Sequence, residues 1–166
     1  ERGNAIQLTG RVLTELQEYP VLLEKAEAPG KSNAISSIAK LTFCVETPQV
    51  QAVEACLKEV EKTFQNELAA SDYVEMIVEN GGQISECEAF TTETVRKLRG
   101  ILTLMPQGVM KMSMAVHGLV ETSINTGSMM EEDGAIVLES ALRSSVESEK
   151  YFVRDKVQLI ADMFGA

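Results

Sequence analysis

The stretch from residue 47 to residue 68 carries apolar residues at regular intervals of three and four positions. These apolar residues are Val50, Val53, Leu57, Val60, Phe64 and Leu68, and acidic residues and lysines lie between them. This spacing places the apolar side chains on one face of an α-helix. Because such a face must be buried against another element, the pattern predicts a helix packed on a second layer of structure.

Three further segments have the pattern of helices. The first opens after Asn4, a good N-cap residue, with Ala5, Leu8, Val12 and Leu16 on one face, and should end before Pro20. A second covers residues 92–99 and is stopped by residues 106–108. The last begins at about residue 148, with an apolar side made of Phe152, Val153, Val157, Ile160 and Phe164.

Extended segments alternate with these helices. Residues 21–27 and 38–45 are predicted to pair as strands on either side of a turn at residues 29–32, and residues 73–78 are a third strand candidate. Strands over residues 109–114, 119–125 and 135–142 are separated by Gly118, Gly127 and Gly134. The order predicts an α+β two-layer sandwich of the ferredoxin-like type, with helices on one face of a mainly antiparallel sheet. Its 166 residues suit a single domain.

Charge and hydropathy exclude several classes of partner. The formal net charge is −10, and no stretch gathers lysines or arginines, so the chain is not expected to bind nucleic acid. No run approaches the roughly 18 apolar residues that cross a bilayer, and the N-terminus lacks a signal-peptide pattern. We therefore expect a cytoplasmic protein with no membrane partner.

The residues that make metal and nucleophilic sites are scarce. The three cysteines, Cys44, Cys56 and Cys87, lie at wide spacings without a C-x-x-C pair, and are interpreted as small core residues. With one histidine, the chain does not offer the usual ligand set of a catalytic zinc ion. We predict no catalytic residue and no metal ligand in this chain.

Four segments, in this order and spacing, resemble the lid of the aminoacyl-histidine dipeptidases, a group within the di-zinc family of aminoacylases, carboxypeptidases and carnosinases. The segments are Arg2-Gly3-Asn4-Ala5 before an amphipathic helix, Gly30-Lys31-Ser32-Asn33-Ala34-Ile35, the ten residues from Gly118 to Gly127, and Leu142-Arg143-Ser144-Ser145. The second is similar to an Asn-Ala-Ile-Pro motif of the family, with Ser36 where a proline is usual.

The resemblance implies that residues 1–166 are one lid and dimerisation domain of a larger cytoplasmic metallopeptidase whose catalytic domain is absent here. It implies that the parent enzyme binds two zinc-type ions and hydrolyses dipeptides such as those ending in histidine. The lid would close over the substrate, contact its own catalytic domain and the dipeptide, and contribute to a homodimer.

The resemblance also assigns substrate-binding residues. Arg143 stands where relatives carry an arginine that pairs with the substrate's terminal carboxylate, a task suited to a planar, permanently charged group. Asn33 and Asn4 correspond to lid asparagines that reach the substrate, although a turn and a helix cap also account for them. A surface arginine at a strand end is the alternative for Arg143.

Three other polar features are given structural interpretations. Asn125 is interpreted as a strand-end residue, and His117 as a structural or exposed histidine. The acidic run at residues 131–133 is expected to form a solvated turn, because it lacks the spaced ligands of a calcium loop.

A different function remains open from the residues alone. The chain could be a free-standing ferredoxin-like domain that binds a small ligand or forms oligomers. A stand-alone enzyme is disfavoured, because no nucleophile is paired with a base in the sequence. Flanking metal-ligand motifs in the coding sequence would favour the dipeptidase.

Overall fold

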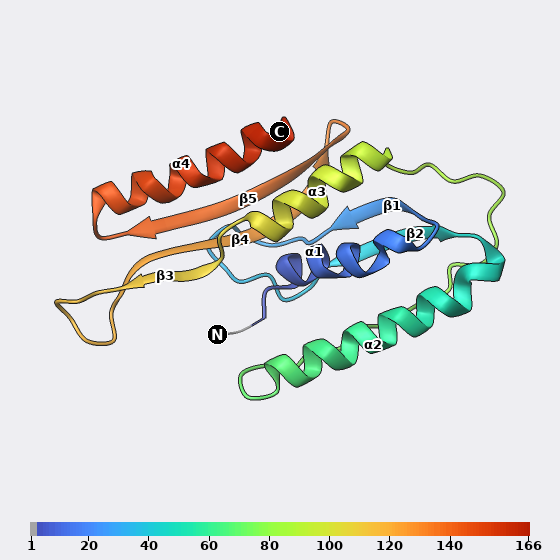
Figure 1. The fold of residues 1–166 in the computed structure, drawn as a ribbon, viewed down its shortest axis with the longest axis horizontal. Helices are drawn as coiled ribbons and strands as arrows, with labels where there is room; N and C mark the ends of the chain where they lie inside the picture. The colour runs from blue at the N-terminus through green and yellow to red at the C-terminus, as the bar shows by residue number, and fades with distance from the viewer. Residues whose placement is uncertain (1–2) are drawn as a thin grey trace.

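The computed structural model describes residues 3–166, so Arg2, the first residue of the Arg2-Gly3-Asn4-Ala5 motif, lies outside the described residues. In chain order the elements are α1 (Ala5–Glu15), β1 (Val21–Glu27), β2 (Lys40–Val45), α2 (Val50–Leu68), α3 (Thr92–Leu104), β3 (Gly108–Met112), β4 (Val120–Glu132), β5 (Ala135–Ser144) and α4 (Glu147–Phe164). Short 3-10 turns, Leu16–Glu18 and Thr47–Gln49, follow α1 and precede α2. The predicted α+β class is confirmed (Figure 1).

The strands form two antiparallel groups joined at one point. β1 pairs with β2, and β4 lies between β3 and β5. An isolated bridge connects the groups: the Ala28 N–H donates to the Met129 carbonyl at 2.7 Å, and the Met129 N–H donates back at 3.0 Å. The end of β1 therefore runs beside β4, as a ferredoxin-like sheet requires.

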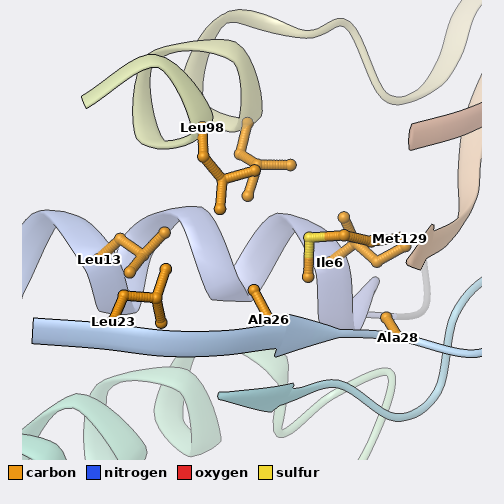
Figure 2. Close-up of a cluster of buried hydrophobic side chains, with 8 residues drawn as sticks. Ile6, Leu13, Leu23, Ala26, Ala28, Leu98 and Met129 are labelled. Carbon is orange, nitrogen blue, oxygen red and sulfur yellow. The ribbon is translucent and has the colours of Figure 1, made fainter. Parts of the chain in front are cut away.

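Helices α1 and α3 cover this junction. The core cluster contains Ile6 and Leu13 from α1, Leu98 and Leu102 from α3, and Leu23, Ala26, Ala28 and Met129 from the sheet (Figure 2). A Cβ atom added at Gly10 would lie 2.7 Å from Leu102 Cβ, so the small residue permits the two helices to pack closely. The apolar layer between helices and sheet is the predicted two-layer core.

A second cluster packs α2 against α1 and the first two strands. Its buried members are Val12, Leu16, Val53, Val60 and Phe64. The last three come from α2, in the spacing that predicted this helix.

Helix α4 lies along β5 and contacts α3 (Figure 1). Its Phe164 ring packs directly on Gly100 of α3, where any side chain would clash. Val153 is its buried residue, whereas Phe152 is 56% exposed. The predicted apolar side of this helix was therefore wrong at Phe152, because the helix touches the core along a narrower stripe than its composition indicated.

The predicted strand at residues 73–78 does not form. This segment instead runs along α2, where the Gln65 amide donates to the Val74 carbonyl at 3.1 Å and the Met76 N–H donates to Glu61 Oε1 at 2.8 Å. Val74 and Met76 pack on the cluster beneath α2. Side chains of the helix thus satisfy backbone groups that a neighbouring strand would otherwise satisfy.

The interpretation of all three cysteines as separate core residues was wrong for two of them. Cys44 of β2 forms a disulfide with Cys87, their Cα atoms being 6.3 Å apart, and Cys56 is free. The bond fastens the irregular connection between α2 and α3 to the sheet.

Breaking this disulfide should lower the melting temperature, because the bond constrains the unfolded chain across a separation of 43 residues. A cross-link of this span contributes about 4 kcal/mol by loop-closure entropy. The measurement is thermal unfolding with and without reductant, beside thiol titration of the denatured chain. We expect one titratable thiol before reduction and three after it.

Cys87→Ser should melt like the reduced wild type and be insensitive to reductant. Equal melting of the oxidised and reduced wild type would contradict a stabilising role.

Candidate functional site

Arg143 lies on β5 with its side chain exposed. The register places it opposite Ser123 of β4. Its guanidinium group has no hydrogen bond or ion pair with any of residues 3–166. A planar guanidinium group without a partner can bind an anion such as a carboxylate through two parallel N–H···O hydrogen bonds.

Asn33 lies in the long connection between β1 and β2. It is part of a turn in which the Ala34 N–H donates to the Lys31 carbonyl at 2.9 Å. The Asn33 side chain is exposed, and its amide has no partner within the described part of the chain. Both its donor and its acceptor are therefore free to meet a ligand.

One small pocket brings Asn33 and Arg143 together. Its volume is about 100 Å³, and it is lined by Ser32, Asn33, Ile35, Ser123, Asn125, Ala141 and Arg143. Since a water molecule takes roughly 30 Å³ of liquid, this space suits a group of a few heavy atoms, such as a carboxylate. Arg143 is the one formally charged residue in the lining.

The sheet supplies four of these residues through strand alternation. Ser123 faces Arg143 and Asn125 faces Ala141 across the β4–β5 pair, so the four side chains share one face. The intervening Ile124 points to the other face and is 2% exposed. The pocket thus has a rigid floor made by two paired strands.

The wall that carries Asn33 depends on two glycines. The backbone of Gly30 and Lys31 crosses β4 at Gly127, and a Cβ atom on Gly127 would clash with the Lys31 carbonyl and lie 2.8 Å from Ser32 Cα. A Cβ atom on Gly30 would clash with the Gly127 carbonyl in turn. This crossing places the 31–35 turn directly on the strand pair.

Asn4 lies behind the pocket and is not part of its lining. It is 7% exposed and caps α1, accepting from the Ile6 N–H at 2.9 Å and the Gln7 N–H at 3.4 Å. Its amide nitrogen donates to Asn125 Oδ1 at 3.0 Å and to the Thr126 carbonyl at 2.8 Å. The predicted cap is confirmed, and the substrate role of Asn4 stays a prediction.

Asn125 was not predicted as a site residue. Its interpretation as a strand-end residue was wrong, because β4 continues to Glu132 and Asn125 lies inside it. Its side chain lines the pocket. The signal that could have found it is the two-residue period that it shares with Ser123 on a strand facing Arg143.

His117 lies in the exposed loop between β3 and β4 and does not line the pocket.

Within residues 3–166 no three His, Cys, Asp or Glu side chains lie close enough to hold a metal ion. The described residues therefore do not fit the zinc ions that the resemblance implies. No helix in this part of the chain is long and apolar enough to cross a membrane.

No protein-family model matches the sequence. The chain is 24% identical to the cytosol non-specific dipeptidase of Escherichia coli (strain K12) over 166 residues, which cover 99% of this chain and 34% of that protein. The chain is homologous to a segment of a dipeptidase. It spans about a third of its relative's length.

The structure is also similar to that of the aminoacylhistidine dipeptidase from Vibrio alginolyticus. The TM-score is 0.89 at 25% sequence identity, over 98% of this chain and 33% of that protein. The fold described above is therefore the fold of one part of that dipeptidase.

Gly127→Ala should displace the 31–35 turn and destabilise the chain by about 1–3 kcal/mol, as overpacking of a close contact does. Thermal unfolding and hydrogen exchange at residues 31–36 measure the two effects. Gly81→Ala is the matched control, because a Cβ atom there meets nothing within 4 Å. Similar melting and exchange in both variants would show that the crossing is not tight.

Proposed function

We propose that residues 1–166 form the lid domain of a cytoplasmic zinc-dependent dipeptidase that hydrolyses Xaa-His dipeptides. Homology and fold support the dipeptidase part of the proposal, since both relatives are dipeptidases by name. The name of the Escherichia coli relative supports the cytoplasmic location.

The observation that carries the lid's substrate role is the shared pocket of Arg143 and Asn33. Arg143 would pair with the terminal carboxylate of the dipeptide through charge-assisted hydrogen bonds. Asn33 would add a neutral amide that can donate and accept beside it. Two such contacts fix both the position and the direction of the substrate.

The zinc ions belong to the remaining part of the proposed enzyme, where they would supply the hydrolytic chemistry. This domain's own residues hold the end of the substrate and cover it, which excludes water from the site. The domain therefore contributes to the reaction by orienting the substrate and by enclosing it.

The proposed partners are the enzyme's own catalytic domain, the dipeptide substrate and a second subunit, with neither nucleic acid nor membrane among them. Exposed apolar residues on the β3–β4 hairpin support an association surface: Met112 is 44%, Met114 94% and Val116 53% exposed. Apolar side chains gathered at a surface are typical of regions that contact another protein or domain.

Arg143→Ala in the full-length enzyme should lower kcat/KM roughly 10- to 100-fold, because hydrogen bonds to a charged group are worth about 1.5–3 kcal/mol. Arg143→Lys should restore little, since an ammonium group cannot form two parallel N–H bonds. Steady-state kinetics on one Xaa-His dipeptide measures this, with thermal melts as the control for folding. Near-wild-type kcat/KM in both variants would remove Arg143 from the substrate site.

The isolated chain should hydrolyse no dipeptide and bind no stoichiometric zinc, because residues 3–166 contain no cluster of three ligands. Calorimetry with zinc and an activity assay on the same dipeptide are the measurements. Tight one-to-one zinc binding with turnover would overturn the lid proposal.

A further inference from the structure

Asn125 holds the turn that carries Asn33. Its amide nitrogen donates to the Ala34 carbonyl at 2.6 Å and approaches the Ser32 carbonyl at 3.4 Å. These two carbonyls belong to the residues on either side of Asn33. A single side chain from the sheet therefore fixes the backbone on both flanks of a predicted substrate ligand.

The other end of the Asn125 amide is fixed as well. Its Oδ1 atom accepts from Asn4 Nδ2 at 3.0 Å, and Asn4 is held in place by the Thr126 carbonyl and by the first turn of α1. Asn4 therefore orients the Asn125 amide so that its N–H₂ group faces the turn. A side-chain network in which each amide atom has a partner favours a single geometry.

Arg143 and Asn33, the two predicted substrate-binding residues, stand on backbone segments of different regularity, so a contact between the segments is needed to fix their relative position. Arg143 stands on β5, which pairs with β4 along nearly its whole length. Asn33 stands on a connection that has neither helix nor strand from residue 29 to residue 39. Asn125 belongs to β4, so its hydrogen bonds connect the irregular 31–35 turn on one side of the pocket to the β4–β5 strand pair on the other.

We propose that Asn125 is a positioning residue, which sets Asn33 against Arg143 for a two-point grip on the carboxylate end of a dipeptide. This inference rests on the proposed function. Asn125 acts through Asn33, so its removal should cost no more than the removal of Asn33 itself.

The test is a double-mutant cycle in the full-length enzyme, with kcat/KM for one Xaa-His dipeptide as the measured quantity. Asn33→Ala and Asn125→Ala should each lower kcat/KM about tenfold, and the double variant should be no worse than Asn33→Ala. Asn80→Ala is the matched control, because within residues 3–166 this exposed asparagine makes only a local bond, which it accepts from the Gly82 N–H. It should leave kcat/KM unchanged.

Asn125→Asp is a second variant at this position, to be used if Asn125→Ala does not fold. It has nearly the same shape and still accepts from Asn4, yet it cannot donate to the turn. It should increase hydrogen exchange at residues 32–35 with its secondary structure retained, and this exchange is the readout of the lost bond. Its kcat/KM should fall at least as far as that of Asn125→Ala, because the new carboxylate also lies in the pocket with Arg143.

The outcomes separate this inference from the proposed function. Unchanged kcat/KM in both Asn33→Ala and Arg143→Ala would overturn the proposed function together with the inference. Losses in those two variants, combined with an unchanged Asn125→Asp or with additive losses in the Asn33→Ala and Asn125→Ala pair, would overturn the inference alone.

Discussion

The bridge between Ala28 and Met129 is the constraint on which the rest of the structure depends. Both residues are fully buried, and their two backbone hydrogen bonds join the β1–β2 pair to the β3–β4–β5 group. Because Gly30 follows two residues later, the chain leaves the sheet and crosses β4 at once at Gly127. The turn with Asn33 must then land on the face of β4 and β5 that presents Arg143.

The sequence predicted the regular elements better than their connections. Helices and paired strands follow from local periodicity, and the acidic run ends in an exposed Asp133-Gly134 turn with positive φ at both residues, as a tight hairpin requires. The errors concern contacts between distant residues. The 73–78 segment hydrogen-bonds to side chains of α2, and Cys44 forms a disulfide with Cys87, which is distant in sequence. The residues around these positions carry no local pattern that indicates either contact.

The residues of the candidate site were predictable in part. Arg143 and Asn33 were identified through a resemblance, and the structure brings them to one pocket, which no spacing in the sequence indicates. Asn125 was missed because its strand was expected to end there. Its pairing with Ala141 continues the strand, and this depends on the β4–β5 register rather than on any residue near Asn125 in sequence.

The charge of the chain bears on the part that the neutral pocket residues would play in the proposed function. With a net charge of −10, the protein does not attract anions from a distance, and charges beyond about 8 Å are largely screened at physiological ionic strength. In the proposed function, Arg143 would therefore act only on direct contact, where it would accept any accessible carboxylate. In the proposed function, discrimination would come from the directional amide of Asn33. It would then depend on how firmly the pair of Asn4 and Asn125 behind the turn holds that amide.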